Sequence, residues 1–364
     1  MRVSWVLCSM IAVLVAAGSA DAQQPRMRRS DDPVPAVTPA KPTVGTKRYR
    51  GARKPSAVPP RANPATPAGA PRAAAVKRDT ADCLQEKDAE RQIAGCTRVV
   101  EDDKQTERVR AVAHYNRGNA LAVKGDHDGA IADYDAAIKL APKNARAYNN
   151  RGTVYRDKGD AAHALADFAQ AAQLNPRDAD AHYNLGNAYA AKDAPERAIA
   201  AYGAAIKADR RNANAYVARA IAQLYAGAPA KALADLRFAH MVAPTNAYAA
   251  LWLDIAERRA KRPGTLARAA RRVDMKAWPA PVIRLWRGEI APDALLVAAD
   301  NANAATKQAQ VCEANFYGGE LALLKGTKDE ATKLLQAAAK DCPEPFLERI
   351  AANAELKALG VKAD

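Results

Sequence analysis

The sequence contains few of the side chains that catalysis or metal binding usually requires. Its 364 residues include five cysteines and five histidines, and aromatic residues make up 5% of the chain. It has no Gly-rich phosphate loop and no H-E-x-x-H, Gly-x-Ser-x-Gly or C-x-x-C motif. We therefore expect no enzymatic activity, no cofactor and no metal site.

The histidines are too scattered to form a set of metal ligands. His127, His163 and His240 have no partner at ligand spacing. His114 and His182 occupy the same place of a repeating unit described below, which indicates packing or lining of a groove. A catalytic site would have to be assembled from remote residues, an alternative that a single sequence leaves open.

Acidic residues are nearly absent from residues 23–78, where thirteen lysines and arginines stand against Asp31 and Asp32. This stretch also holds eleven of the 22 prolines, and its net charge of +11 leaves only +4 for residues 79–364. Such a composition predicts a disordered tether. Tyr49 alone is available for base stacking, which argues against nucleic-acid binding. A solvated spacer and attraction to an anionic envelope surface remain the alternatives.

The N-terminus lacks an apolar run long enough to span a bilayer. Residues 3–17 are mostly apolar and are followed by the small residues Ala20 and Ala22, so we predict a signal peptide over residues 1–22. A membrane anchor is the alternative, but about 20 apolar residues would be needed. Cys8 follows Leu7 rather than a small residue, so we expect no lipid anchor on this exported, periplasmic or secreted chain.

Residues 111–246 contain four copies of a 34-residue unit. In each copy, small and apolar residues recur three and four positions apart around a central break, which predicts two amphipathic helices and a turn. Small residues let the two helices approach closely, and proline ends the second helix. The marks are clearest in the second copy, where they are Gly152, Gly159, Ala164, Phe168, Ala171 and Pro176.

Small residues at the eighth, twentieth and twenty-seventh places of such a unit resemble the tetratricopeptide repeat. The resemblance implies an all-α fold, a right-handed α-solenoid of helix-turn-helix repeats that follows the signal peptide and the tether. A generic Ala-rich helical bundle is the alternative, but a bundle has no reason to repeat with this period.

Helical segments are also predicted on both sides of the four repeats. Residues 79–110 should form an N-terminal hairpin cap, and residues 247–311 are a divergent helical segment in which Asp254 replaces the expected glycine. The repeat pattern resumes over residues 312–345, and residues 346–364 should form a capping helix over the apolar end.

The C-terminal half is similar to the NlpI type of periplasmic tetratricopeptide lipoprotein. The similarity rests on the tryptophan-containing departure after residue 278 and on the final repeat NFYGGELALLKG. It implies an adaptor that docks envelope proteins, such as proteases or peptidoglycan hydrolases, without catalysis of its own.

A peptide-binding groove is expected on the first helices of the repeats, which line the concave face of such solenoids. Asparagine at these places offers both donors and an acceptor to the backbone of an extended peptide, and arginine adds positive charge. Asparagine that serves only helix and loop contacts is the alternative. The expected groove residues are Tyr115, Asn116, Asn119, Arg146, Asn149, Asn150, Thr153, Arg156, Tyr183, Asn184 and Asn187.

Four cysteines of the exported chain should form two disulfides. Units of a solenoid touch only their neighbours, so bridges between its two ends are excluded. The sequence therefore predicts the pairs Cys83–Cys96 and Cys312–Cys342.

A second binding mode is suggested by a basic cluster between residues 258 and 276. It comprises eight lysines and arginines against Asp274 alone. With the tether, this cluster could bind an anionic envelope polymer, although a solvated helical face is the common meaning of such a charge pattern. The cluster comprises Arg258, Arg259, Lys261, Arg262, Arg268, Arg271, Arg272 and Lys276.

Overall fold

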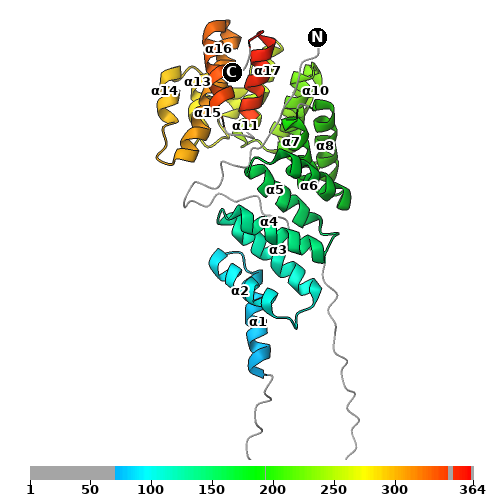
Figure 1. Cartoon of the computed structure of the whole chain (residues 1–364). Helices are drawn as coiled ribbons and strands as arrows, with labels where there is room; N and C mark the ends of the chain where they lie inside the picture. The colour runs from blue at the N-terminus through cyan, green and yellow to red at the C-terminus, as the bar shows by residue number, and fades with distance from the viewer. Residues whose placement is uncertain (1–69, 193, 343–346, 362–364) are drawn as a thin grey trace, which may run out of the picture. The chain divides into compact units, whose positions relative to one another are not determined.

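The described part of the chain consists of helices joined by turns and loops. The computed structural model describes residues 70–192, 194–342 and 347–361, so the predicted signal peptide and most of the predicted tether lie outside the described residues. These ranges contain seventeen helices and no strand (Figure 1). Residues from Val76 onward belong to one compact unit. The all-α class expected from the sequence is confirmed.

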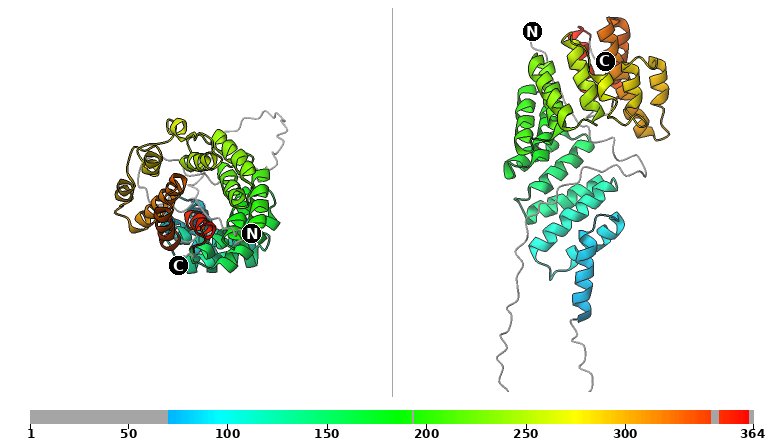
Figure 2. Two further views of the ribbon diagram at one scale, coloured as in Figure 1. Left: turned by 90° about the horizontal axis from the view of Figure 1, so that it is seen from above. Right: turned by 180° about the vertical axis from the view of Figure 1, so that it is seen from behind.

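Eight helices form four consecutive hairpins across the predicted repeat segment. Each first helix packs against its own second helix and against the second helix of the preceding hairpin, which is the solenoid arrangement expected (Figures 1 and 2). The first helix begins at Glu107 rather than 111, because Thr106 caps it by accepting a hydrogen bond from the Val109 amide. The hairpins are α3 (Glu107–Val123) with α4 (His127–Leu140), α5 (Ala145–Asp157) with α6 (Ala161–Leu174), α7 (Ala179–Ala191) with α8 (Pro195–Ala208), and α9 (Ala213–Tyr225) with α10 (Pro229–Val242).

Local sequence specifies both the turns and the close approach of the paired helices. Gly125 follows α3 with a positive φ of 80°, a conformation that glycine adopts without steric cost. Asp126 then caps α4 by accepting a hydrogen bond from the Gly129 amide. Gly186 provides the close approach of α7 and α8, since a Cβ there would lie 2.5 Å from the Tyr202 ring. The Gly-to-aromatic pattern of the repeat is thus a packing requirement.

The N-terminal hairpin consists of α1 (Ala70–Leu84) and α2 (Ala89–Glu101). Helix α1 therefore begins before the predicted tether boundary at residue 78, and the run Ala73–Ala75 explains the difference because alanine is the best helix former. Asp88 caps α2 through the Arg91 amide. Cys83 and Cys96 are joined across this hairpin with an S–S distance of 2.06 Å, the first of the two predicted pairs.

The divergent segment begins with an ordinary first helix that lacks a matching second helix. Helix α11 (Ala247–Arg259) is followed by the short helices α12 (Leu266–Ala269), α13 (Ala280–Trp286) and α14 (Pro292–Ala298). Asp254 is fully buried and accepts hydrogen bonds from the Leu266 amide at 2.9 Å and from Arg258 Nε at 2.6 Å. A carboxylate at the glycine place of the repeat thus binds the backbone of α12 instead of packing against a second helix.

The C-terminal hairpin contains the second predicted disulfide. Helix α15 (Ala304–Lys325) begins before the predicted unit boundary at residue 312 and pairs with α16 (Lys328–Asp341). Cys312 and Cys342 are joined with an S–S distance of 2.04 Å. The last helix, α17 (Leu347–Ala358), packs against both α15 and α16 (Figure 2).

Buried apolar side chains are distributed unevenly along the array. The largest hydrophobic cluster extends from Tyr183 to Leu356 and includes the large side chains Trp252 and Phe316. The clusters before it are small, and one of them consists of Ala130, Tyr134 and Val154 with a few half-buried neighbours. The extensive core therefore belongs to the second half of the described chain.

Candidate binding surface

The candidate site is the set of residues at the fifth, sixth and ninth places of each repeat, all of which lie on its first helix, and we call it the first-helix face. In α3 and α5 these residues are half-buried and mostly polar. In α7 they are buried, although two of the three are asparagines. They are Tyr115, Asn116 and Asn119 on α3, Asn149, Asn150 and Thr153 on α5, and Tyr183, Asn184 and Asn187 on α7.

Hydrogen bonds connect this face between the first and second repeats. Asn150 Nδ2 donates to Asn119 Oδ1 at 2.9 Å and to the Tyr115 hydroxyl at 3.1 Å. The hydroxyl of Tyr134 also donates to Asn119 Oδ1, at 2.8 Å. Asn119 therefore accepts from its own repeat and from the next one, so these side chains bind adjacent repeats to each other.

The second and third repeats are connected in the same way. Asn184 Nδ2 donates to Asn149 Oδ1 at 3.0 Å. Within the third repeat, the Tyr202 hydroxyl donates to Asn187 Oδ1 at 2.7 Å. The Asn184 and Asn187 amides each retain one buried polar atom, Oδ1 and Nδ2 respectively, that has no partner among the described residues. The expectation that Asn150 and Asn184 stand free for a ligand therefore needs correction, because both amides already donate within the protein.

The other predicted groove residues differ in how far they are engaged within the protein. Asn116 is half-buried, and its amide makes no hydrogen bond within the described part of the chain. Arg146 is exposed at the start of α5. Arg156 pairs with its neighbour Asp157 at 2.9 Å, and the Thr153 hydroxyl donates to the Asn149 carbonyl at 3.0 Å. Asn116 and Arg146 are thus the predicted residues best placed to contact a ligand.

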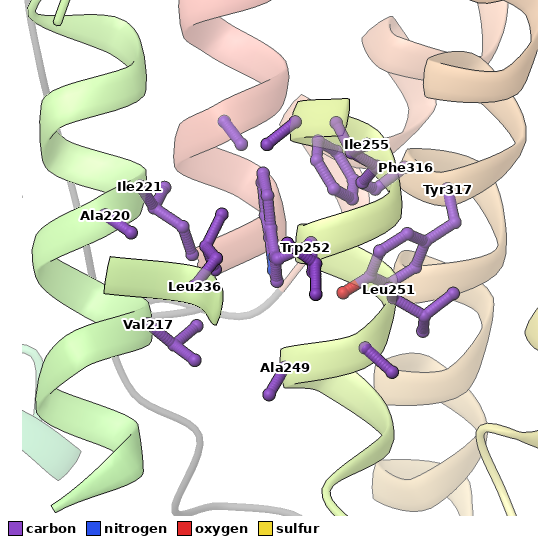
Figure 3. Packing of buried hydrophobic residues seen from close by; sticks show 14 of the residues in the cluster. Val217, Ala220, Ile221, Leu236, Ala249, Leu251, Trp252, Ile255, Phe316 and Tyr317 are labelled. Atoms are coloured by element: carbon purple, nitrogen blue, oxygen red, sulfur yellow. The ribbon is translucent and has the colours of Figure 1, made fainter. Parts of the chain in front are cut away.

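The first-helix face changes character beyond α7. At the same three places, α9, α11 and α15 carry buried and mostly apolar side chains, and those on α11 and α15 pack together (Figure 3). The Trp252 and Phe316 rings, for example, have their centroids 5.5 Å apart. The polar, partly accessible face is therefore confined to α3 and α5, with α7 at its edge. The apolar residues are Val217, Ala218 and Ile221 on α9, Leu251, Trp252 and Ile255 on α11, and Phe316 and Tyr317 on α15.

An ion pair between the paired helices was not anticipated from the sequence. Arg117 donates to Asp133 at 2.7 Å, and Arg151 and Arg219 bind Asp167 and Asp235 in the same geometry. Burial opposes ionisation of Asp133, but hydrogen bonds from Arg117 and His114 outweigh it and lower the pKa of this carboxyl. An Arg and an Asp sixteen residues apart that recur with the repeat period are a signal that the sequence contains.

Neither a metal site nor a membrane span is present in the described ranges. No group of three or more His, Cys, Asp or Glu side chains there could hold a metal ion. No described helix is both long enough and apolar enough to cross a bilayer. His114 hydrogen-bonds to Asp133 at 2.8 Å and His182 to the Pro176 carbonyl at 3.1 Å, so both make structural contacts.

Comparison with known proteins identifies the repeats. Residues 118–159 and 152–193 match the family described as TPR repeat, and residues 179–212 match the family described as tetratricopeptide repeat. No curated relative matches the sequence.

Solved structures that resemble the chain include two of MamA and one of YrrB. A crystal structure of MamA is 23% identical and covers 48% of this chain and 97% of its own, with a TM-score of 0.40. MamA from Desulfovibrio magneticus RS-1 is 22% identical over 47% of this chain and 94% of its own, with a TM-score of 0.41. YrrB, described as a TPR protein with an unusual peptide-binding site, is 20% identical over 54% of this chain and all of its own, with a TM-score of 0.44.

Proposed function

Residues 118–212 belong to the tetratricopeptide repeat family, and from this premise we propose that the chain is a non-catalytic adaptor that binds an extended peptide segment of a partner protein. The peptide lies against the first-helix face of α3, α5 and α7. The observation that carries this proposal is the change along the array, from polar and partly accessible side chains on α3 and α5 to buried apolar ones on α11 and α15.

Side chains on this face favour recognition of a peptide backbone. The Asn116 amide offers two donors and an acceptor, and the half-buried Tyr115 offers both a ring surface and a hydroxyl. Arg146 favours a segment that carries a carboxylate near the start of α5. The inter-repeat hydrogen bonds of Asn150 and Asn184 fix the spacing of the repeats and hold this face in a fixed arrangement before the ligand arrives.

Binding of a selected peptide tests this proposal. A library of extended peptides is selected on the immobilised full chain, and one selected peptide is titrated against wild type and variants. Asn116→Ala together with Arg146→Ala should weaken binding by about 5- to 50-fold, the sum of one hydrogen bond and one exposed charge contact. Arg177→Ala is the matched control, because Arg177 is exposed in a loop between hairpins. Equal effects of Arg146→Ala and Arg177→Ala, with no effect of Asn116→Ala, would reject this face as the site.

We also propose that the protein is exported and that its partners are envelope proteins, including proteases or peptidoglycan hydrolases. The apolar N-terminal run with small residues near position 22 supports export, and so do the two disulfides, because such bonds persist in oxidising compartments. The partner class is implied by the resemblance of residues 278–350 to the NlpI type. Cell fractionation tests the location, and non-reducing peptide mapping should find both disulfides in the protein recovered from the envelope fraction.

An anionic polymer is the second candidate ligand, because six members of the basic cluster are exposed and form no ion pair among the described residues. The other two members form ion pairs with buried carboxylates: Arg258 with Asp254, and Arg259 with Glu320 and Glu355. We call the remaining six the basic surface. They are Lys261, Arg262, Arg268, Arg271, Arg272 and Lys276.

His240 provides a direct readout for ligands at the basic surface. Burial lowers the pKa of His240, and the nearby Arg272 and Arg268 lower it further, while Glu257 acts in the opposite direction. A polyanion bound to these arginines should therefore raise the His240 pKa, as measured by NMR titration with poly-glutamate. Arg268→Gln with Arg272→Gln should abolish the shift. Binding that is independent of salt and leaves the His240 pKa unchanged would reject the basic surface as the site.

A further inference from the structure

Helix α17 covers the part of the first-helix face that lies beyond α9. Its residues Ala351, Ala352 and Leu356 are fully buried in the same hydrophobic cluster as Trp252 and Phe316. The sequence predicts a cap over the apolar end of the last repeat, but α17 also reaches α11, where Glu355 binds Arg259 at 2.6 Å. The chain therefore places one of its own helices on the positions that a ligand would use in the earlier repeats.

Two buried carboxylates interact electrostatically near the N-terminal end of α17. Glu313 of α15 accepts hydrogen bonds from the Tyr248 hydroxyl at 2.9 Å and from Trp278 Nε1 at 2.8 Å. Glu348 of α17 faces the Tyr317 hydroxyl, 3.4 Å away. Glu313 and Glu348 are 2% and 5% exposed, and neither forms an ion pair with a cation among the described residues. We call Glu313 and Glu348 the cation-free pair.

A second pair of carboxylates lies two helical turns along the same two helices and differs in having a cation. Glu320 of α15 and Glu355 of α17 both bind Arg259 of α11, at 2.5 Å and 2.6 Å. Each acid is seven residues from its counterpart in the cation-free pair, so the spacing repeats on both helices. Glu320 occupies the ninth place of its repeat, which Asn119 holds in the first repeat. Burial and Glu355 still raise the pKa of Glu320 to about 7, although Arg259 acts in the opposite direction. Helix α17 is thus held by one pair of acids that shares a cation and one pair that has none, and Glu320 should add a smaller share to any pH dependence.

We propose that α17 is a releasable occupant of the first-helix face of α11 and α15, and that ionisation of the cation-free pair releases it. Its departure exposes a surface that fits an amphipathic helix with two acidic side chains seven residues apart, as in α17 itself. The face available to partners therefore extends from α3–α7 into α11 and α15 when the pair loses its protons.

The direction of the pH effect follows from the surroundings of the two acids. Burial and the facing charge of Glu348 raise the pKa of Glu313 to about 8, although Trp278 and Tyr248 donate to it. Burial likewise raises the pKa of Glu348 to about 7. Once α17 is released, both carboxyls return toward the ordinary glutamate value of about 4.3. The docked form therefore binds more protons between about pH 5 and pH 8, and docking weakens as the pH rises through this range.

Hydrogen–deuterium exchange on the full chain tests the proposal without any partner, so its outcome is separate from that of the peptide-binding experiment. After correction for intrinsic exchange rates, the protection of residues 347–358 should fall by up to about tenfold per pH unit for each proton lost. With two protons and the pKa values above, the fall is roughly 1,000-fold between pH 5.5 and pH 7.5. The amides of α4 should keep their protection over the same range. Binding of a fluorescent apolar dye should rise in parallel as Trp252 and Phe316 become accessible.

Two variants assign the effect to the cation-free pair. Glu313→Gln with Glu348→Gln keeps the size of the side chains and removes both charges, so the protection of α17 should become much less dependent on pH. Glu196→Gln, at an exposed position on α8, is the matched control and should behave as wild type. Unchanged protection of α17 up to pH 8.5, an unaltered pH profile in the double variant, or equal loss of protection in α4 and α17 would each overturn the proposal.

Discussion

At the residue scale, asparagines that suit a ligand also connect the repeats. The sequence places Asn116 and Asn150 at the same position of successive units, and periodicity gives no means of telling them apart. In the structure they differ, because Asn150 donates to Asn119 and Tyr115 of the preceding unit whereas Asn116 follows the N-terminal hairpin. A residue's role in a repeat array thus depends on which unit precedes it.

Asn150→Ala should therefore destabilise the protein, although alanine is a better helix former than asparagine. It removes the two hydrogen bonds that Asn150 donates and the long one that it accepts from Asn149. Asn119 then loses one of its two donors, so we expect a loss of about 1–2 kcal/mol in the free energy of unfolding. Asn116→Ala should change it by less than about 0.5 kcal/mol. Urea denaturation of both variants checks this, and equal stabilities would contradict the assigned role of Asn150.

Gly186→Ala tests the close approach of α7 and α8. A Cβ at this position would lie 2.5 Å from the Tyr202 ring, which cannot withdraw because its hydroxyl donates to Asn187. We expect a loss of about 1–3 kcal/mol from overpacking. Gly203→Ala is the control, because its nearest neighbour would be an Arg219 nitrogen at 3.7 Å, and it should be neutral or stabilising by up to about 1 kcal/mol. Thermal melts that rank the two variants in the opposite order would refute this account of the packing.

At the scale of elements, three of the four hairpins carry an arginine–aspartate pair and one does not. The third hairpin has Leu185 and Ala201 at the places that hold Arg151 and Asp167 in the second. Both partners are thus replaced together. This is expected if a buried aspartate without its arginine destabilises the fold more than two apolar residues of suitable size do.

Replacing Arg151 and Asp167 of the second hairpin by the leucine and alanine of the third tests this explanation. Arg151→Leu alone leaves Asp167 buried without its main partner and should cost about 2–3 kcal/mol. Adding Asp167→Ala should recover most of the lost free energy of unfolding, because no unpaired carboxylate then remains buried. A double-mutant cycle by chemical denaturation measures the coupling, and additive single effects would show that the pair contributes nothing specific.

The elements also define how far the sequence could predict the structure. The 34-residue period located the four hairpins, because each one is specified by local helix, turn and cap signals. It could not locate the partners of Asp254, because the backbone of α12 meets this carboxylate only through the fold of a divergent segment. The contact of α17 with α11 was not predicted for the same reason. It joins Arg259 and Glu355, which are 96 residues apart, and such a contact produces no repeating pattern in the sequence.

At the scale of the whole described chain, the two disulfides lie in the first and last hairpins. A terminal unit has a neighbour on one side only, so it is the place where an array of repeats loses structure first. Cys83–Cys96 joins the two helices of the first hairpin, and Cys312–Cys342 joins the two helices of the last one. Each bond thus stabilises a terminal unit from within.

Removing the N-terminal bond should therefore have a local effect. Cys83→Ala with Cys96→Ala should cost about 2–4 kcal/mol in the stability of α1 and α2, because the small cluster around Val99 offers little else to hold them. Limited proteolysis should show faster cleavage within residues 79–110 and unchanged cleavage within α9 and α10. Cleavage that accelerates equally along the chain would indicate a cooperative role for this bond instead.

The uneven hydrophobic core has a consequence for how tightly a partner can be held. The face proposed for peptides belongs to the half with small apolar clusters, whereas the large cluster begins at Tyr183. Regions with few buried apolar contacts open at a lower free-energy cost than the rest of a protein. The inter-repeat hydrogen bonds of Asn150 and Asn184 therefore carry much of the order of this face, and variants that lose them should bind a peptide more weakly because fewer molecules present the binding-competent arrangement.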